Sequence, residues 1–188
     1  MNDLRSQLLD QIRRYAIHFG HFTLTSGRTS HFYIDCRKVT LSARGAFLTG
    51  NTMLDLLEGI DIQAVGGMTV AADPVATAIA VESWHRNHPL NAFIVRKEAK
   101  GHGLQRQVEG PLQAGDRVAV VDDTLTTGGS ILQAIEAVEA AGAEVVAVAV
   151  ILDRLEGGAE RIRQRGYPVY SVLTYEDIRD FVDAHRAE

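Results

Sequence analysis

Hydrophobic residues change their spacing along this chain, and each spacing predicts a different kind of element. Over residues 3–18, apolar side chains recur at helical intervals, which predicts an amphipathic helix. From His21 to Arg37, apolar and polar residues alternate on either side of Ser26-Gly27, which is typical of a β-hairpin. The pattern therefore predicts a small N-terminal α+β unit over residues 1–40.

After residue 40 the pattern becomes regular, because short apolar runs alternate with segments of helical spacing. The predicted strands are 64–67, 92–95, 118–121, 145–152 and 169–173, and the predicted helices are about 42–59, 73–84, 130–141, 161–164 and 175–185. Asp73-Pro74 predicts an N-cap followed by a proline at the first helical position. The run Val145–Leu152 is apolar throughout and is typical of a strand buried on both faces.

Alternating strands and helices favour right-handed crossovers and a parallel sheet that is covered by helices on both faces. No internal repeat or linker divides the chain. We therefore predict one α/β domain over residues 1–188, with its core at about 41–175 and a C-terminal helix over 176–188.

Composition and charge exclude several classes of protein. Hydrophobic residues make up 46% of the 188 positions and charged residues 23%, values typical of a folded globular chain. The single cysteine, Cys36, excludes an intrachain disulfide and a cysteine-based zinc site. A net charge of −5 argues against binding of nucleic acid, and the apolar runs are too short for a bilayer or a secretory signal. We expect a cytoplasmic protein that binds neither nucleic acid nor membrane.

Ligands of parallel α/β sheets bind at the carboxyl ends of the strands. This rule points to three segments of the sequence, Gly66–Pro74, Arg96–Gly110 and Asp122–Ser130. The last of them carries the most information, because an apolar strand runs into two acids, then hydroxyl residues, then two glycines, then an amphipathic helix.

The segment Asp122–Ser130 predicts a site for a sugar phosphate. Gly128 and Gly129 let the backbone approach a ligand, and the N-terminus of the following helix offers unpaired N–H groups. Asp122 and Asp123 would repel a phosphate unless they bind sugar hydroxyls or a metal carried by the ligand. A Walker A loop needs a lysine after the second glycine, where this chain has Ser130, and no G-x-G-x-x-G occurs. The alternative is an ordinary strand–turn–helix connection with solvated acids.

A second segment is strongly basic. Four fixed cations and one histidine fall within residues 96–106, between glycines that permit motion. Such a loop can close over a polyphosphate and neutralise the charge of a leaving group. The alternative is a solvated surface loop.

Four segments resemble known motifs. Asp122–Ser130 resembles the ribose-phosphate signature of the type I phosphoribosyltransferases, which use phosphoribosyl pyrophosphate (PRPP). The string R-K-E-x-K-x-H-G that begins at Arg96 resembles the mobile loop of the orotate phosphoribosyltransferase family. Phe22–Arg28 with Phe32–Asp35 resembles that family's N-terminal hood, and Ile151–Arg154 with Glu156-Gly157-Gly158 resembles the strand end that meets orotate. The resemblance spans about residues 4–175.

Two positions depart from this family pattern. Related enzymes often carry a lysine that contacts the substrates where this chain has Thr25, which can offer a hydrogen bond but no charge. Many relatives have a glycine where Ala71 stands in the segment Gly66–Asp73.

The resemblance implies a type I phosphoribosyltransferase fold, with a central parallel sheet flanked by helices and a small N-terminal α+β hood over residues 1–40. It implies transfer of ribose 5-phosphate from PRPP to orotate, which gives orotidine 5′-monophosphate and pyrophosphate in pyrimidine nucleotide synthesis. The implied catalytic residues are Lys100, His102, Asp122 and Asp123. The implied PRPP-binding residues are Arg96, Lys97, Lys100, His102, Asp122, Asp123, Thr124, Leu125, Thr126, Thr127, Gly128, Gly129 and Ser130.

The family also suggests how the second substrate is bound. Arg154 would pair with the carboxylate that distinguishes orotate from other pyrimidines, and Thr126 would touch the ring. Mg²⁺ is implied as cofactor, held mainly by PRPP and water rather than by a dedicated protein site. The family further implies a homodimer in which the loop 96–110 is shared across the interface. Two other functions remain open, namely a phosphoribosyltransferase for another base and a non-catalytic regulator that senses PRPP.

Overall fold

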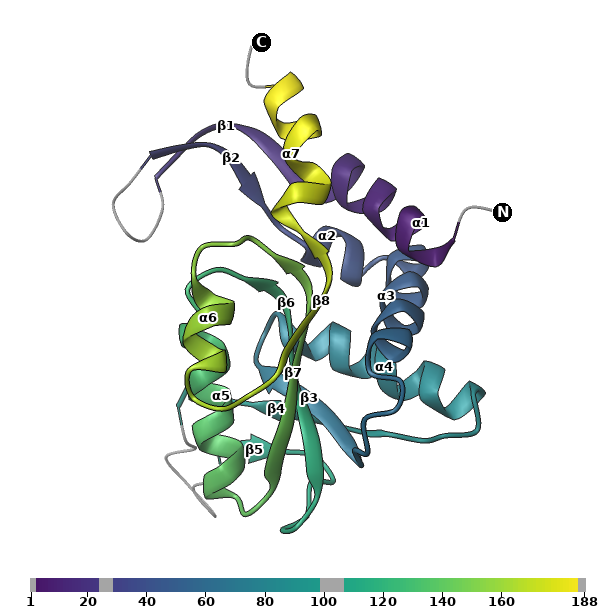
Figure 1. Ribbon diagram of the computed structural model, residues 1–188. Helices are drawn as coiled ribbons and strands as arrows, with labels where there is room; N and C mark the ends of the chain where they lie inside the picture. Colours follow the sequence, from purple (N-terminus) through teal and green to yellow (C-terminus); the bar gives the residue numbers. More distant parts are fainter. Residues whose placement is uncertain (1–2, 24–28, 99–106, 186–188) are drawn as a thin grey trace.

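The computed structural model describes residues 3–23, 29–98 and 107–185 (Figure 1). Its helices are α1 (Leu4–Gln11), the π-helical turn η1 (Ile12–Ala16), α2 (Arg37–Thr40), α3 (Ala43–Leu56), α4 (Ala72–His85), α5 (Gly129–Ala140), α6 (Gly158–Arg163) and α7 (Tyr175–Ala184). Its strands are β1 (Ile17–Thr23), β2 (Thr29–Ile34), β3 (Ala64–Met68), β4 (Asn91–Val95), β5 (Val108–Glu109), β6 (Arg117–Leu125), β7 (Glu144–Asp153) and β8 (Val169–Thr174). None of the helices in these ranges has the length and apolar character needed to cross a bilayer.

The main sheet has the strand order β5-β4-β3-β6-β7-β8. Neighbouring strands run parallel throughout, except that the short edge strand β5 runs antiparallel to β4. The predicted parallel sheet is confirmed, and β5 is an addition that the sequence pattern did not indicate. Its two residues are too few to produce a readable alternation.

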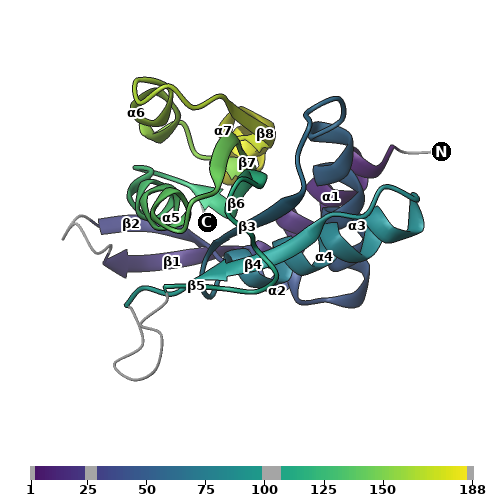
Figure 2. The same ribbon diagram turned by 90° about the horizontal axis from the view of Figure 1, so that it is seen from below.

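Helices cover both faces of the sheet, as predicted (Figures 1 and 2). Along β6, Ala119 and Val121 pack into the hydrophobic cluster that contains α3 and α4. Val118 and Val120 point to the opposite face and pack against α5 and α6. This alternation follows from the two-residue period of a strand. The apolar run of β7 lies between β6 and β8, and its residues from Ala147 to Leu152 are fully buried, which confirms a strand buried on both faces.

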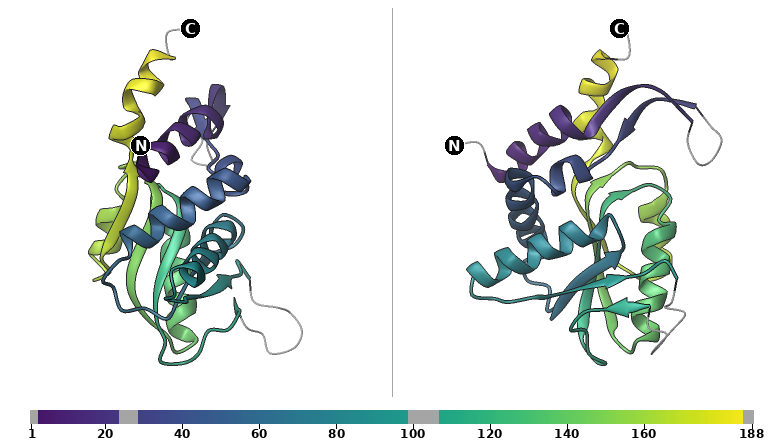
Figure 3. Two further views of the ribbon diagram at one scale, coloured as in Figure 1. Left: turned by 90° about the vertical axis from the view of Figure 1, so that its right-hand side faces the viewer. Right: turned by 180° about the vertical axis from the view of Figure 1, so that it is seen from behind.

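The N-terminal hood is a helix followed by a hairpin, but the helix is shorter than predicted. α1 ends at Gln11, the π-helical turn follows, and β1 begins at Ile17. The reason is strand pairing, because Ile17 already faces Ile34 in the antiparallel ladder of the hairpin. The hairpin projects from the body of the molecule in Figures 1 and 3, beside the C-terminal helix α7. Phe19 and Phe181 join the two with ring centres 6.0 Å apart.

Other boundaries also differ from the prediction. β6 was expected to end at Val121 but continues to Leu125, because β7 keeps pairing with it as far as the partners Leu125 and Asp153. α4 begins at Ala72, so Asp73 lies in the first turn rather than at the N-cap. The short helix α2 was not predicted, since four residues carry no measurable period.

The close packing of β3 against β6 generates a prediction. A Cβ atom on Gly67 would lie 2.1 Å from the carbonyl oxygen of Val121 and 2.8 Å from Cβ of Ala72. We expect Gly67→Ala to lower the free energy of unfolding by about 2–3 kcal/mol, because a backbone oxygen cannot rotate away as a side chain can. Urea denaturation measures the change.

Gly129→Ala is the matched control for this prediction. Among the described residues, no heavy atom lies within 4 Å of a Cβ added at Gly129. Its free energy of unfolding should stay within about 0.5 kcal/mol of the unchanged chain. Equal effects of the two substitutions would contradict the packing argument.

Candidate active site

The segments singled out in the sequence meet at one edge of the sheet. β3 leads through α4 to β4 on one side, whereas β6 leads through α5 to β7 on the other. β3 and β6 are neighbours, so the chain leaves them in opposite directions and opens a crevice at their carboxyl ends. Figure 1 shows the hairpin β1–β2 beyond this edge of the sheet. The structure therefore brings Gly66–Asp73, Asp122–Ser130 and Arg154 to one region.

The turn between β6 and α5 leaves the N-terminus of a helix uncapped, which is a geometry that can accept an anion. Gly128 adopts a left-handed conformation with φ of 77°, and no side chain caps the N-terminus of α5 there. The N–H groups of the first helical turn therefore remain available to a ligand, and the helix dipole favours a negative charge. The start of α6 stabilises this turn, because the Gly158 N–H donates to the carbonyl oxygen of Thr126 at 2.9 Å. A Cβ on Gly158 would lie 2.4 Å from that oxygen, so this close approach requires glycine.

The two acids lie inside β6, not in the loop after it as the sequence suggested. Asp122 is 5% exposed and Asp123 is 8% exposed. Oδ1 of Asp122 accepts a hydrogen bond from the Asp123 N–H at 2.9 Å, and its Oδ2 accepts one from the Ser130 hydroxyl at 3.3 Å. Burial raises the pKa of Asp122 to about 7, and the adjacent charge of Asp123 adds to the rise. This carboxyl is therefore poised to share a proton near neutral pH.

Asp123 faces the hood. Burial raises its pKa, while the hydrogen bond from the Thr124 N–H and the charge of Arg37 oppose that rise. The Thr124 hydroxyl donates to Sγ of Cys36 at 3.4 Å, which joins the end of β2 to the end of β6. Arg37 itself holds Asp35 through two contacts of 2.7 and 3.2 Å. The hood thus places the ion pair of Arg37 and Asp35 next to the buried acids, where Arg37 lowers and Asp35 raises the pKa of Asp123, a feature that sequence reasoning missed.

Arg154 follows the last residue of β7 directly. Its backbone N–H donates to the carbonyl oxygen of Leu125 at 2.9 Å. Its side chain is 14% exposed, with Nη2 at 3.0 Å from Oε1 of Glu156 and the guanidinium carbon 5.3 Å from the centre of the Phe32 ring. Nε is buried and has no hydrogen-bond partner in the part of the chain that the structure describes. The Nε atoms of Arg13 and Arg117 share this feature, so the distinguishing property of Arg154 is its place at the carboxyl end of β7 with a mostly buried guanidinium.

The basic loop is described only at its base. The Arg96 N–H donates to the carbonyl oxygen of Gln107 at 2.8 Å, and the Gln107 side chain returns a bond of 2.9 Å to the carbonyl oxygen of Arg96. The Arg96 guanidinium lies 3.6 Å from Glu109, and Lys97 is exposed. The antiparallel pairing of β4 with β5 closes this base. The predicted residues Lys100 and His102, like Thr25 in the hairpin, lie outside the described residues.

The segment Gly66–Asp73 forms the other wall of the crevice. The Thr69 N–H donates to the carbonyl oxygen of Val95 at 2.8 Å, and its hydroxyl donates to Oδ2 of Asp73 at 2.7 Å. Oδ1 of Asp73 is buried without a hydrogen-bond partner among the described residues. Asp73 therefore fastens the loop to the first turn of α4, a function that the N-cap interpretation did not foresee.

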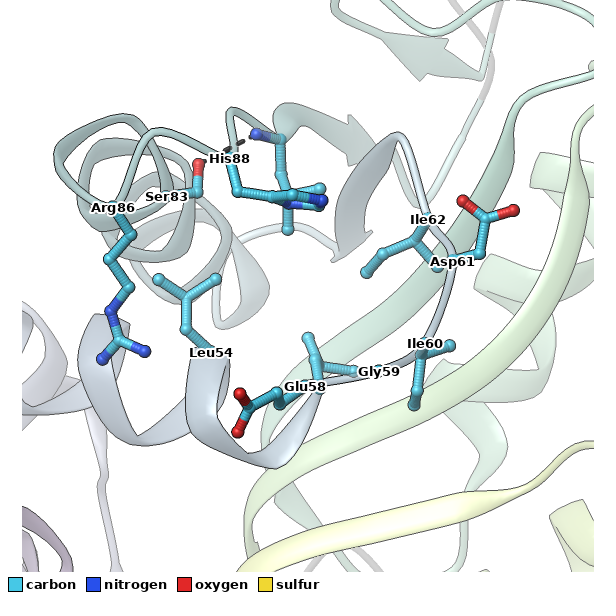
Figure 4. Close-up of a pocket in the computed structure, with 11 residues that line it drawn as sticks. Leu54, Glu58, Gly59, Ile60, Asp61, Ile62, Ser83, Arg86 and His88 are labelled. Carbon is cyan, nitrogen blue, oxygen red and sulfur yellow. Dashed lines mark hydrogen bonds between the residues drawn. The ribbon is translucent and has the colours of Figure 1, made fainter.

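A well-formed pocket lies elsewhere, at the opposite ends of the strands (Figure 4). It has a volume of about 480 Å³ and is lined by Leu54, Ser83, Arg86 and Leu90 among others. Two of its polar side chains already have partners, because the Ser83 hydroxyl accepts from the Leu90 N–H at 2.9 Å and Arg86 binds Asp55 at 2.6 Å. This pocket lacks the convergent unpaired groups of the crevice, which we take as the functional site.

No group of three or more histidine, cysteine, aspartate or glutamate side chains within the described ranges could hold a metal ion. The acids Asp122 and Asp123 are adjacent carboxyls whose burial would be relieved by a cation brought with a ligand.

Comparison with known proteins identifies the family. The model of the phosphoribosyl transferase domain matches residues 66–183. The orotate phosphoribosyltransferase of Streptomyces avermitilis is 53% identical over 162 residues, covering 86% of this chain and 89% of that protein. The Mycobacterium tuberculosis enzyme of the same name is 45% identical over 174 residues, covering 93% and 96%. Its crystal structure in complex with PRPP has a TM-score of 0.81 at 41% identity, over 94% of this chain and 99% of that one.

The fold is that of a type I phosphoribosyltransferase. The fold alone does not name the base, because an adenine phosphoribosyltransferase from Leishmania tarentolae also shares it, with a TM-score of 0.63 at 22% identity. By sequence identity over most of its length, the chain belongs to the orotate phosphoribosyltransferase family.

The raised pKa of Asp122 predicts a pH dependence of stability. A carboxyl whose pKa rises on folding, here from 3.8 to about 7, binds its proton more tightly in the folded state. Its contribution to stability is present below pH 3.8 and is lost as the pH rises towards 7. We expect Asp122→Asn to become more stable relative to the unchanged chain between pH 5 and pH 8. Urea denaturation across this range measures the difference.

Asp10→Asn is the control, since Asp10 is an exposed carboxyl on α1. Its stability curve should run parallel to that of the unchanged chain. If the Asp122→Asn curve also ran parallel, Asp122 would not bind its proton more tightly on folding.

Proposed function

We propose that this chain is an orotate phosphoribosyltransferase, which transfers ribose 5-phosphate from PRPP to orotate and releases pyrophosphate. The observation that carries the proposal is Arg154, whose guanidinium is 14% exposed and whose backbone is fixed to Leu125, at the start of the turn that leads into α5. A guanidinium fork matches a carboxylate, and a carboxylate is what orotate adds to a plain pyrimidine. The names of the relatives agree with this assignment.

Each part of the crevice then has a task in the reaction. The turn from Thr126 to Ser130 would hold the 5′-phosphate on the N–H groups of α5, with Thr124 and Leu125 leading into it. Asp122 and Asp123 would bind the ribose hydroxyls. Bond cleavage at the anomeric carbon develops positive charge on the sugar, which two nearby carboxylates favour more in the transition state than in the ground state.

The leaving pyrophosphate would be bound from the other side. Arg96 and Lys97 stand at the base of the basic loop, next to the carboxyl end of β4. From the sequence motif we assign Lys100 and His102 to the same group of cations, with the additional task of closing the site. Thr126 would contact the orotate ring, because its carbonyl already joins the phosphate turn to the segment that follows Arg154.

Mg²⁺ enters this proposal together with PRPP. The diphosphate supplies hard oxygen ligands of the kind that Mg²⁺ prefers, and the ion neutralises the charge that develops on the leaving group. The buried carboxyls of Asp122 and Asp123 fit such an ion as neighbours.

A homodimer is also part of the proposal. Large apolar side chains stand exposed on one side of the described structure, with Leu41 at 70%, Phe47 at 50%, Val70 at 62% and Val81 at 50%. They line a groove of about 680 Å³ between α2, α3 and α4. Contiguous apolar surface of this kind is typical of protein interfaces, and it includes the loop Gly66–Asp73 of the site. A second copy seated there would bring its own basic loop near this crevice.

Product formation tests the function directly. The purified chain with PRPP and Mg²⁺ should consume orotate and form orotidine 5′-monophosphate, followed by the loss of orotate absorbance. Adenine and uracil serve as parallel substrates. Turnover of adenine instead would assign the chain to another base, and binding of PRPP with no turnover of any base would assign it to a regulator.

Arg154→Lys tests the carboxylate assignment. The substitution keeps the charge but loses the two-pronged geometry, so we expect the KM for orotate to rise roughly tenfold while the KM for PRPP changes little. Steady-state kinetics with each substrate varied in turn measure both constants. Equal weakening of both substrates, or of neither, would refute the pairing of Arg154 with the base.

Sharing of the basic loop is tested by mixing two inactive variants, Lys100→Ala and Asp123→Asn, under conditions in which subunits exchange. In a mixed dimer the Lys100→Ala subunit has intact acids and would receive the intact loop of its partner. Random exchange makes about half of the dimers mixed, with one working site each, so activity should recover to roughly a quarter of the unmutated level. Activity that stays at background despite demonstrated exchange would show that each loop serves its own subunit.

A further inference from the structure

The contact between Glu156 and Arg154 depends on a turn with left-handed backbone conformations at Leu155 and Gly157. Leu155, which separates them, has a φ of 56°, a left-handed conformation that is uncommon for a branched side chain. Its N–H donates to Oδ1 of Asp153 at 2.9 Å, which stabilises the turn. Gly157 continues it with a φ of 88°. The chain thereby folds back after β7, and the carboxylate of Glu156 reaches the guanidinium two residues before it.

Two contacts hold the Arg154 guanidinium, and a third holds its backbone. Glu156 takes Nη2 at 3.0 Å, Phe32 lies under the cationic plane at 5.3 Å, and the backbone is fixed to Leu125. Within the described structure, the buried Nε keeps its hydrogen without an acceptor. The contact with Glu156 therefore fixes the rotation of the planar guanidinium above the Phe32 ring.

We propose that Glu156 is a positioning residue for the acceptor base: it holds the Arg154 guanidinium in the orientation in which the guanidinium pairs with the carboxylate of the incoming substrate. The inference rests on the proposed function and adds a residue to it. Glu156 does not touch the substrate in this arrangement and acts only through Arg154. Without it, the long side chain of Arg154 would have to be ordered by the substrate itself, at a cost in affinity.

The burial of this ion pair distinguishes it from the pairs around it. The side chains of Arg154 and Glu156 are 14% and 34% exposed. The nearby pair of Arg163 and Glu160 is 52% and 65% exposed, with its atoms 3.7 Å apart. Exposed pairs of that kind contribute little, whereas a charge-assisted hydrogen bond to a mostly buried guanidinium is stronger and more directional.

Steady-state kinetics of four proteins test this inference: the unchanged chain, Glu156→Ala, Glu156→Gln and the control Glu160→Ala. For Glu156→Ala we expect the KM for orotate to rise roughly tenfold, because a charge-assisted hydrogen bond that orders Arg154 is lost. kcat and the KM for PRPP should stay within about twofold. Glu156→Gln should recover part of the loss, since its amide oxygen can accept the same bond from Nη2. Glu160→Ala should behave as the unchanged chain.

Several outcomes would overturn the inference. A KM for orotate that stays unchanged or falls in Glu156→Ala would mean that Glu156 is idle or competes with the substrate for Arg154. Equal changes in both KM values, together with a lower melting temperature, would mean a structural role. If the alanine variant fails to fold, the isosteric glutamine variant carries the test, and an orotate KM equal to that of the unchanged chain refutes the proposal. If the unchanged chain itself does not convert orotate, the proposed function fails, and that result is distinct from a failure of Glu156 alone.

Discussion

The site depends on the pairing of β6 with β7, because this pairing continues past the apolar residues of both strands. The parallel ladder continues to Leu125 and Asp153, and by doing so it carries Asp122 and Asp123 into the sheet. The same ladder ends at the two points from which the phosphate turn and Arg154 begin. A sheet that stopped at Val121, as the apolar pattern suggests, would leave both acids in solvent and would not fix the distance between the sugar and base sites.

This pairing has an electrostatic consequence. Two adjacent carboxyls are taken out of water, and this burial raises the pKa of each. The Ser130 hydroxyl stabilises the charged form of Asp122, and the charge of Arg37 stabilises that of Asp123. A positively charged sugar, or a cation that accompanies the diphosphate, would stabilise these charged forms further. In the proposed reaction, the acids would therefore stabilise the positively charged transition state of the glycosyl transfer more than the ground state.

The sequence predicts most of this architecture for a physical reason. Strand and helix periods, glycines before a helix, and an unbroken apolar run in β7 are local properties, so the parallel sheet and the phosphate turn could be inferred without coordinates. The errors arose where distant parts of the chain meet. Pairing with β7 extends β6, and pairing of Ile17 with Ile34 ends the first helix early. Asp73 accepts a hydrogen bond from the Thr69 hydroxyl and does not cap α4. The contacts of Phe32 and Glu156 with Arg154 were likewise beyond reach, because neither residue type in isolation indicates a partner.

The division of labour within the site explains how one fold can serve different bases. In the proposed function, the phosphate turn (Thr126–Ser130) and the acids come from a single continuous segment, β6 to α5, and all of them except Thr126 bind only the sugar phosphate. The environment of Arg154 is instead assembled from three separate segments, namely Phe32 in the hood, Leu125 at the end of β6 and Glu156 after β7. Changes at these points can alter the base that is accepted without disturbing the phosphate turn. The Leishmania tarentolae adenine phosphoribosyltransferase, with the same fold at 22% identity, is consistent with this separation. In the proposed function, selection of the base therefore depends on the contacts of Arg154 with Phe32, Leu125 and Glu156, whereas the segment from β6 to α5 binds the sugar phosphate that the whole class shares.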